Sequence, residues 1–222
     1  MKNYEIILFD LDGTLTDPKV GIVNSIKYAL HKMKKPGLIE LDLLKFIGPP
    51  IQHSFANICH MNEEEVQQAV HYYREYFSKN GMMENKLYDG IRELLNALHK
   101  EGKKLLVATS KPTVFAVQIV NYFQLENYFI EVVGSELDGT RIDKKDIIEY
   151  IFQKYAFFPK QNAVMIGDRS HDIIGAKKMN VHSIGVEYGY GSKEELVNAG
   201  ADYIAKSVSH LNMLLQDNKV NR

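Results

Sequence analysis

The sequence predicts an α/β fold in which a Rossmann-like parallel sheet carries helices on both faces and is interrupted by an inserted all-helical domain. A short apolar run at residues 6–9 is followed, after residue 88, by further apolar runs that alternate with helical patterns. Strands that alternate with helices indicate a parallel sheet covered on both faces. Residues 18–87 contain helical patterns and no convincing strand. We therefore expect a core built from residues 1–17 and 88–222, with residues 18–87 as the helical insertion.

The elements of the first half follow from their apolar spacing. Residues 6–9 (Ile-Ile-Leu-Phe) form a continuous apolar run, which is typical of a strand buried on both faces. In the insertion, the proline-containing segment 46–51 predicts a loop between two helices, because Pro49 and Pro50 disfavour helix there. The apolar stripes of those helices are Ile22, Ile26, Ala29, Leu30 and Met33, and Val66, Ala69, Val70, Tyr73 and Phe77.

The second half alternates strand and helix more regularly. Expected strands are 105–108, 131–134, 163–166 and 181–186. A helix ending at Gly102 precedes the first of these, and a second helix runs from Pro112 toward Tyr122. We expect Asp143 to cap a third helix. Ser192 and Glu195 form the pattern of a capping box for a fourth helix, which Gly200 ends.

Composition narrows the class of protein. The chain of 222 residues has a formal net charge of −1 and no run of basic residues, which argues against a nucleic-acid polymer as partner. Its single cysteine, Cys59, excludes an internal disulfide and fits a reducing compartment. The chain opens without a signal-peptide pattern, and no apolar stretch reaches membrane-spanning length. We expect a cytoplasmic protein without a membrane partner.

Two carboxylates follow the first predicted strand. Asp10 and Asp12 come directly after residues 6–9, and Gly13 and Thr14 turn the chain away. The carboxyl ends of parallel strands are where ligands bind in open α/β sheets. Two acids this close repel unless a cation joins them. The pair therefore predicts a metal ion, with one carboxylate as nucleophile and the other as proton carrier.

Other strand ends bring further polar groups to the same edge. Thr109 and Ser110 follow one strand, while Asp168 follows another, with Asp172 four residues later. Because parallel strands point the same way, these groups are expected to converge. Lysines are also expected there: Lys144 and Lys145 open a helix, and Lys111 lies near the edge. Carboxylate and hydroxyl oxygens suit Mg²⁺, which usually keeps several waters and a substrate phosphate oxygen.

These segments resemble the four motifs of the haloacid dehalogenase superfamily. The resemblance rests on residues 9–15 (Phe-Asp-Leu-Asp-Gly-Thr-Leu), Thr109, Lys144 and residues 167–172 (Gly-Asp-Arg-Ser-His-Asp). They occur in the right order over nearly the whole chain, and residues 18–87 resemble the helical cap of that superfamily. Three shorter motifs resemble the branch of phosphoglycolate phosphatases and 5′-nucleotidase-like phosphatases: Thr16-Asp17-Pro18, Gly48-Pro49-Pro50 and Gly189-Tyr190-Gly191-Ser192.

The resemblance implies a role for each motif residue. Asp10 would attack phosphorus and form an aspartyl-phosphate, and Asp12 would protonate the leaving oxygen and later accept a proton from water. The implied phosphate-binding groups are the backbone of Leu11 and Asp12 together with Thr109, Ser110 and Lys144. The implied Mg²⁺ ligands are Asp10, the Asp12 carbonyl oxygen and Asp168, with Asp172 as a direct or outer ligand.

Several assignments have structural alternatives. Thr109 would also suit a cap of the helix that begins at Pro112. Asp172 would also suit the first turn of a helix, where the dipole stabilises it. The choice between Lys144 and Lys145 stays open. Arg169 and Asp17 are expected to be structural, and Cys59 is expected to be an ordinary packed side chain.

The inserted domain is expected to set specificity, because a lid closes over the leaving group. Its Gly48 and Pro49 are the candidate substrate contacts, and Lys19, His53 and Arg74 are weaker ones. The predicted activity is hydrolysis of a small phosphorylated metabolite, either a nucleoside 5′-monophosphate or phosphoglycolate, by a monomer or homodimer. A phosphomutase uses the same residues, and a phosphate-accepting signalling module is the alternative from a different class.

Overall fold

The structure is a computed structural model that describes residues 3–216, and it divides the chain into two compact units. The core unit comprises Met1–Thr16 and Leu87–Arg222, and the helical unit comprises Asp17–Lys86. At the two places where the chain passes from one unit to the other lie short strands, β2 (Thr16–Asp17) and β3 (Lys86–Leu87), which form a two-stranded sheet.

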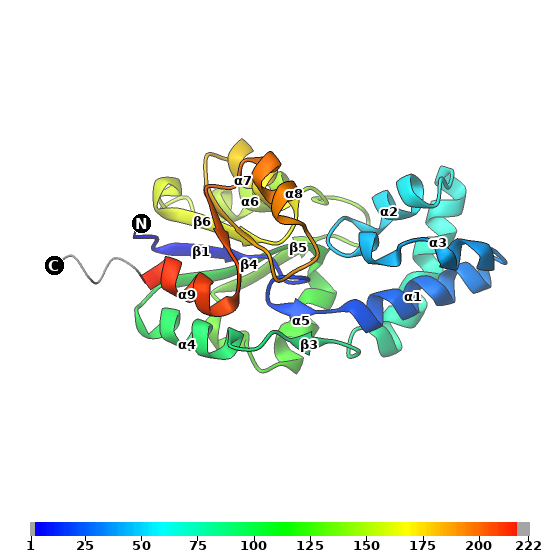
Figure 1. Cartoon of the computed structure of the whole chain (residues 1–222), viewed down its shortest axis with the longest axis horizontal. Coiled ribbons are helices and arrows are strands. Elements are labelled where there is room, and N and C mark those ends of the chain that lie inside the picture. The colour runs from blue at the N-terminus through cyan, green and yellow to red at the C-terminus, as the bar shows by residue number, and fades with distance from the viewer. Residues whose placement is uncertain (1–2, 217–222) are drawn as a thin grey trace. The chain divides into compact units, whose positions relative to one another are not determined.

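A parallel sheet is the centre of the core unit. Within the described residues it has six strands in the order β5-β4-β1-β6-β7-β8, and every neighbouring pair is parallel. The blue strand β1 lies between β4 and β6 (Figure 1). This order winds outward in both directions from β1, so the carboxyl end of β1 lies at the switch point where such sheets bind ligands. The strands are β1 (Ile6–Phe9), β4 (Lys104–Pro112), β5 (Glu131–Ser135), β6 (Ala163–Gly167), β7 (His182–Val186) and β8 (Tyr203–Ala205).

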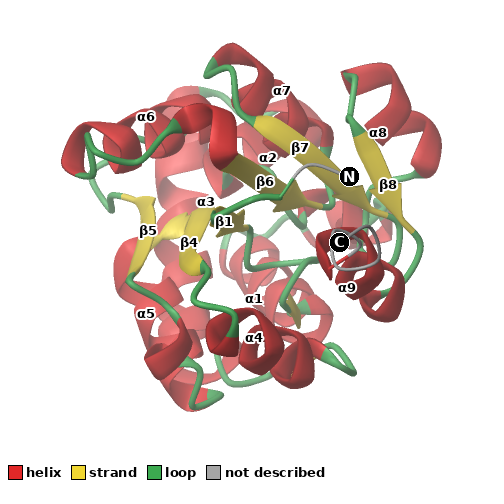
Figure 2. Cartoon of the chain, turned by 90° about the vertical axis from the view of Figure 1, so that its left-hand side faces the viewer, coloured by secondary structure: helices red, strands yellow, loops and turns green. Residues whose placement is uncertain are grey.

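Helices cover both faces of this sheet. Figure 2 shows α6 and α7 on one face and α4, α5 and α9 on the other. None of the helices in the described part of the chain is long and apolar enough to cross a membrane. The helices of the core unit are α4 (Ile91–Lys100), α5 (Thr113–Tyr122), α6 (Lys144–Lys154), α7 (Ser170–Lys178), α8 (Lys193–Ala199) and α9 (Val208–Gln216), with short 3₁₀ turns η4 (Glu126–Tyr128) and η5 (Lys160–Asn162).

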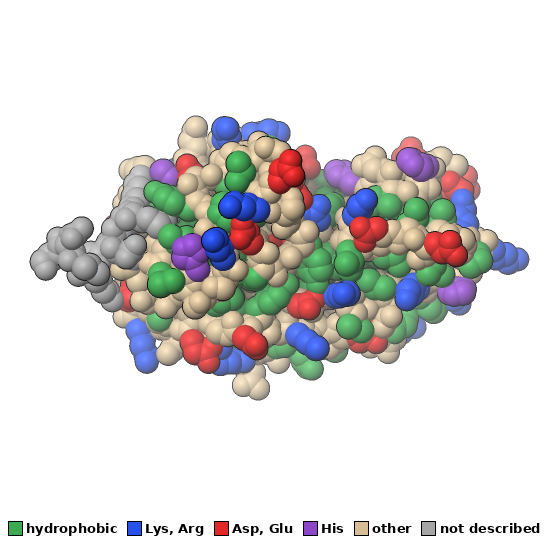
Figure 3. Space-filling view, in the orientation of Figure 1, with side chains coloured by type: hydrophobic (Ala, Val, Ile, Leu, Met, Phe, Trp, Pro, Cys, Tyr) green, Lys and Arg blue, Asp and Glu red, His purple; other side chains and the backbone are tan. Residues whose placement is uncertain are grey.

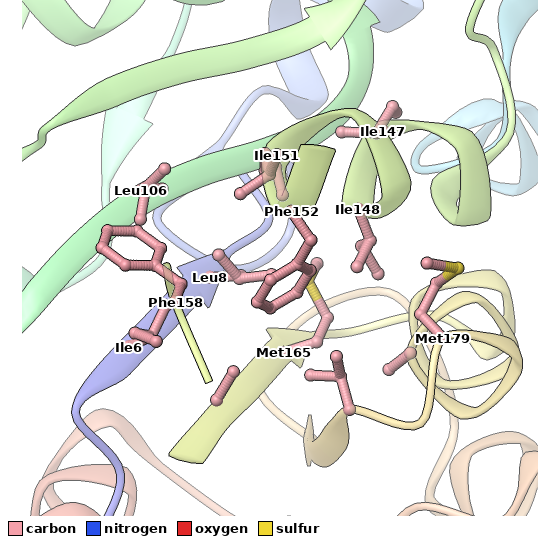
Figure 4. Close-up of a cluster of buried hydrophobic side chains, with 14 of the residues drawn as sticks. Ile6, Leu8, Leu106, Ile147, Ile148, Ile151, Phe152, Phe158, Met165 and Met179 are labelled. Atoms are coloured by element: carbon pink, nitrogen blue, oxygen red, sulfur yellow. The ribbon is translucent and has the colours of Figure 1, made fainter. Parts of the chain in front are cut away.

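A buried apolar cluster joins the sheet to α6 and α7. Leu8 of β1 and Met165 of β6 meet Phe152 of α6 in this cluster (Figure 4). All four residues of β1 are buried, since helices cover the sheet on both sides. That double burial explains why the strand is a continuous apolar run and does not alternate with polar residues.

The helical unit has a separate aromatic core. Tyr73 and Phe77 stack with ring centroids 5.4 Å apart, and Phe55 packs edge-on against Tyr73. The predicted packing role of Tyr73 and Phe77 is therefore confirmed, and buried Cys59 lies in the same unit. The elements of the unit are α1 (Lys19–Lys32), η1 (Pro36–Glu40), η2 (Leu43–Phe46), α2 (Ile51–Ile58), α3 (Glu63–Tyr76) and the π-helical turn η3 (Phe77–Gly81).

The structure corrects several predicted helix boundaries and caps. Asp143 precedes α6, but its side chain makes no capping hydrogen bond. Ser192 Oγ accepts the Glu195 amide N–H at 3.0 Å, as in a capping box. The return bond of the box is replaced, because Glu195 Oε1 accepts the Ser170 N–H at 2.8 Å. Helix α2 begins directly after Pro50, and β8 and α9 have no counterpart in the sequence prediction.

Charge is evenly mixed over the surface that Figure 3 shows. Lys and Arg side chains are interspersed with Asp and Glu, and no extended area of that face carries one sign. The sequence has 27 basic and 28 acidic residues, in keeping with this mixture. The face shown has no basic track of the kind that follows a nucleic-acid backbone.

Leu8→Ala is expected to lower the free energy of unfolding of the core unit by about 2–5 kcal/mol, because it leaves a cavity among fully buried side chains. Urea unfolding followed by circular dichroism measures the loss. Val114→Ala is the control: Val114 is 46% exposed, and its change is expected to stay within about 0.5 kcal/mol. Equal losses of unfolding free energy in both variants would contradict the conclusion that Leu8 of β1 is part of the buried core.

Candidate active site

A tight turn after β1 positions the two carboxylates. The Asp10 N–H donates to the Ile166 carbonyl at 2.8 Å, which continues the sheet pairing one residue beyond the strand. The Leu11 carbonyl then accepts the N–H groups of Leu15 and Thr16 at 2.9 and 3.0 Å. Asp10 and Asp12 are consequently fixed at the carboxyl end of the central strand.

Gly13 permits this turn for two reasons. Its φ is +81°, a left-handed conformation that residues with a Cβ rarely adopt. A Cβ at this position would also lie 2.2 Å from Oδ2 of Asp168. The loop after β1 and the residue after β6 are therefore in close contact, which brings the first and last predicted motifs together.

The Lys144 ammonium lies between two of the predicted acids. Its Nζ is 2.9 Å from Asp10 Oδ1 and 2.7 Å from Asp172 Oδ1, and it donates to the Ala108 carbonyl at 2.7 Å. Lys145 is exposed and lies 3.9 Å from Glu149 on the outer face of α6. The geometry thus resolves the open choice: Lys144, not Lys145, lies beside Asp10.

Burial and mutual repulsion set the protonation of this cluster. Burial raises the pKa of Asp10 to about 6, against the lowering effect of Lys144. Burial and then the neighbouring carboxylates Asp172 and Asp10 raise the pKa of Asp168 well above its usual value. Burial also acts to raise the pKa of Asp172, but Lys144, together with His171 and the Arg169 N–H, more than offsets it and holds that pKa below the ordinary range. One ammonium does not neutralise three buried acids, so the cluster favours a further cation.

Asp168 is held by one oxygen only. Its Oδ2 accepts the Tyr190 N–H at 2.7 Å, from the loop that follows β7. Its Oδ1 is buried and has no hydrogen-bond partner in the described part of the chain. In the same loop the Tyr188 hydroxyl donates to the Thr14 carbonyl at 3.1 Å, which ties the loop to the turn after β1. A buried carboxylate oxygen without a hydrogen-bond partner lowers the stability of the fold unless a bound ligand interacts with it.

A candidate metal centre lies at the same place. Asp10, His171 and Asp172 each offer one ligand atom, and these atoms all lie within 4.8 Å of one another. Burial lowers the pKa of His171, which favours the neutral imidazole. His171 belongs to the motif at residues 167–172, which by itself indicates no role for this side chain. The donors are mainly carboxylate oxygens, as a hard divalent cation requires.

Asp12 pairs with Lys111, for which the sequence indicates only a place near the sheet edge. Lys111 Nζ lies 2.5 Å from Asp12 Oδ2, while Asp12 Oδ1 is buried without a hydrogen-bond partner in residues 3–216. The signal was available, because Lys111 follows Thr109 by two residues near the end of β4. Sequence alone did not show which acid it meets.

Thr109 and Ser110 lie at the end of the same strand region. The Thr109 hydroxyl donates a hydrogen bond to Asp10, which helps to lower the pKa of Asp10. The same hydroxyl accepts the Lys111 N–H at 3.3 Å. Helix α5 has no side-chain cap at Pro112, so Thr109 does not cap that helix. The Ser110 carbonyl accepts the Ser135 hydroxyl at 2.9 Å, while its own hydroxyl is buried without a described partner.

The remaining predicted residues have other surroundings. Gly48 and Pro49 are partly buried in the helical unit, between η2 and α2, and Gly48 has a φ of +105°. Their role as substrate contacts stays a prediction. Arg169 pairs with Glu195 at 3.0 Å, and Asp17 accepts the Lys19 N–H at 3.1 Å. Both therefore make the structural contacts expected of them.

Comparison with known proteins identifies relatives that match most of the chain. A model of haloacid dehalogenase-like hydrolases matches residues 7–186. A 5′-nucleotidase of Pseudomonas aeruginosa is 45% identical over 87% of each chain. The tyrosine-protein kinase PtkA of Mycobacterium tuberculosis is 36% identical over 91% of this chain and 66% of its own. A phosphoglycolate phosphatase of Vibrio vulnificus is 26% identical over 93% of this chain and 94% of its own. The crystal structure of a predicted phosphatase from Clostridium acetobutylicum has a TM-score of 0.91 at 49% identity, and the match covers 96% of this chain and 99% of that one.

Lys144→Met is expected to lower the free energy of unfolding by about 3–5 kcal/mol in metal-free buffer at pH 7, because it leaves Asp10 and Asp172 buried without their cation. Lys145→Met removes only an exposed pair, and its loss is expected to stay below about 0.5 kcal/mol. Chemical denaturation of both variants in chelator makes the comparison. Equal losses would show that Lys144 does not neutralise the cluster.

Proposed function

The chain belongs to the haloacid dehalogenase-like hydrolases, and from this membership we propose that it is a Mg²⁺-dependent phosphomonoester hydrolase that acts through an aspartyl-phosphate. One observation carries the proposal. Asp10 is buried at the carboxyl end of the central strand, with Lys144 bound to its carboxylate and Asp12 two residues away. The proposed nucleophile, a cation and the proposed proton carrier thus lie where an α/β sheet binds its ligand.

The chemistry uses the two acids in turn. Asp10 attacks the phosphorus atom, and the ester P–O bond breaks as the new P–O bond to Asp10 forms. Asp12 gives its proton to the departing oxygen. In the second half Asp12 takes a proton from a water molecule, which attacks the phosphoryl group and restores the Asp10 carboxylate. Phosphate and the free alcohol are the products.

Donors around Asp10 stabilise the phosphoryl oxygens during both steps. Lys144 supplies the positive charge, and Thr109 and Ser110 supply hydroxyl groups from the end of β4. The backbone N–H groups of Leu11 and Asp12 are the remaining donors of this proposal. Such prearranged donors act more strongly in a buried site than in water.

The residues present fit a Mg²⁺ ion. Asp10, the Asp12 carbonyl oxygen and Asp168 would hold it, with Asp172 as a direct or outer ligand. The buried Asp168 Oδ1, which has no hydrogen-bond partner in the described residues, and the raised pKa of Asp168 support this assignment. When bound, the ion would offset the repulsion between the anionic nucleophile and the anionic phosphate.

We propose a small phosphorylated metabolite of the cytoplasm as the substrate. The 5′-nucleotidase at 45% identity favours a nucleoside 5′-monophosphate, and the phosphoglycolate phosphatase at 26% identity makes phosphoglycolate the second choice. The helical unit, with its Gly48-Pro49 loop, would choose between leaving groups. This choice concerns the alcohol part of the ester, since the core residues in the proposal contact the phosphoryl group and the departing oxygen but not the rest of the alcohol.

Two other phosphoryl-transfer reactions are the alternatives to hydrolysis. A phosphomutase would return the phosphoryl group to its product, and a kinase such as the relative PtkA would pass it to a tyrosine. Both need an acceptor other than water. Release of inorganic phosphate from a monoester, without a bisphosphate and without a protein acceptor, separates hydrolysis from both.

Asp10→Asn is expected to lower kcat/KM by roughly 10³-fold or more for every phosphomonoester, because the amide is a poor nucleophile. A panel of nucleoside monophosphates, phosphoglycolate and sugar phosphates, read by released phosphate, measures the effect. Asp89→Asn, an exposed acid in the same unit, is the control. Retention of most turnover by Asp10→Asn, with an unchanged Tm, would refute the nucleophile assignment.

Removal of divalent cations is expected to abolish phosphate release, and Mg²⁺ is expected to restore it. A saturating concentration of Mg²⁺, about 100 times the Kd, also stabilises the fold by about 2.7 kcal/mol. Thermal unfolding with and without Mg²⁺ reports that gain independently of turnover. Asp168→Asn should lose most of the Mg²⁺-dependent rise in Tm, and Asp89→Asn should keep it. Full activity in chelator would exclude the metal.

A further inference from the structure

Lys111 lies at the carboxyl edge of the sheet beside the proposed proton carrier, and the proposed chemistry gives it no role. Its ammonium nitrogen lies 2.5 Å from Asp12 Oδ2, and the two side chains are only 6% and 10% exposed. A charge-assisted contact at this distance, largely shielded from water, is stronger and more directional than a surface ion pair. It fixes one oxygen of Asp12.

The path of β4 brings Lys111 to this place. The pairing of β4 with β5 shifts between Ala108 and Pro112, so residues 109–111 bulge out of the regular ladder. On β5, Gly134 faces the bulge, where a Cβ would lie 2.2 Å from the Lys111 carbonyl oxygen. Bulges beside active sites re-aim side chains. This one carries Lys111 at its end, next to Thr109, whose hydroxyl accepts the Lys111 N–H at 3.3 Å.

We propose that Lys111 is a positioning residue for Asp12: the bulge of β4 holds its ammonium on Asp12 Oδ2, and this leaves Oδ1 aimed at the oxygen of the leaving group. The second oxygen supports the assignment, because Asp12 Oδ1 is buried and has no hydrogen-bond partner in the described residues. A free aspartate rotates broadly about its terminal torsion, and misplacement by about 1 Å costs about 100-fold in rate.

The inference deepens the proposed function and rests on it. In the step concerned, the bond from phosphorus to the Asp10 oxygen forms while the ester P–O bond breaks. The proton on Asp12 Oδ1 passes to the departing oxygen, so that a neutral alcohol leaves. Lys111 keeps its protons throughout and touches neither the phosphorus atom nor the leaving group. Its effect should therefore depend on how much the leaving group needs that proton.

Esters with different leaving groups test this. When a nucleoside 5′-monophosphate reacts, the nucleoside departs as an alkoxide unless Asp12 protonates it, whereas the p-nitrophenolate that departs from p-nitrophenyl phosphate is stable without a proton. Lys111→Met is expected to lower kcat/KM about 100-fold for the nucleoside monophosphate and less than about fivefold for p-nitrophenyl phosphate. Because Lys111 does not contact the phosphoryl group in the proposal, the inhibition constant of inorganic phosphate for Lys111→Met should stay within about twofold of the wild-type value, which is roughly the error of the assay.

Two further variants complete the design. Lys111→Gln keeps a hydrogen-bond donor without the charge and should show the same leaving-group dependence to a smaller degree; it replaces the methionine variant if that one does not fold. Lys145→Met, which alters an exposed lysine of the same unit, should leave both kcat/KM values unchanged.

The outcomes separate the possible roles. Equal losses for both esters with a raised phosphate inhibition constant would make Lys111 a phosphate-binding residue and overturn the proposal. Unchanged kinetics with both esters would overturn it as well. If the wild-type protein releases phosphate from neither ester, the hydrolase function itself fails, which is distinguishable from a failure of Lys111 alone.

Discussion

Repulsion among buried carboxylates is the constraint on which the rest of the core depends. Asp10, Asp168 and Asp172 are almost completely buried at the end of the sheet, and Lys144 is the cation that the structure sets between two of them. Burial of one unpaired charge costs several kcal/mol, so the arrangement is tolerable only with that ammonium and with backbone donors such as the Tyr190 N–H. The fold supplies both through helix α6 and the loop after β7, which are distant in sequence and meet at one edge of the sheet.

The sequence predicted the architecture because the signals for it are local. The strand at 6–9 is a continuous apolar run, and the structure has β1 at Ile6–Phe9. Helices with a clear apolar stripe, such as α1 and α3, were found for the same reason. By contrast, α2 has only eight residues, and β8 has three. Elements this short carry too few periods to be recognised, and their stability comes from packing that the sequence does not display.

The candidate site divides in a similar way. The order of strand ends indicated that Asp10, Thr109 and Asp168 would converge, because parallel strands point to a common edge. Pairings between side chains were not predictable. Lys144 and Lys145 are adjacent in sequence, and the phase of α6 determines which of them faces Asp10. Likewise, the meeting of Lys111 with Asp12 depends on a bulge in β4, a backbone irregularity that leaves no composition signal.

Asp12 and Asp168 share one further property, which links the stability of the core to its chemistry. In each, one carboxylate oxygen is anchored, by Lys111 or by the Tyr190 N–H, and the other is buried with no hydrogen-bond partner in the part of the chain that the structure describes. An unsatisfied buried acceptor costs about 1–3 kcal/mol. A protein selected for stability alone would complete these acceptors with its own donors. Asp12 follows β1 and Asp168 follows β6, so both carboxylates lie at the edge of the sheet where Asp10 lies, and in the proposed mechanism a cation and the leaving group would complete the open oxygens. The anchored oxygens hold the two carboxylates in place, and the other two oxygens stay open to ligands. In the proposed mechanism the carboxylates are therefore preorganised before the substrate binds.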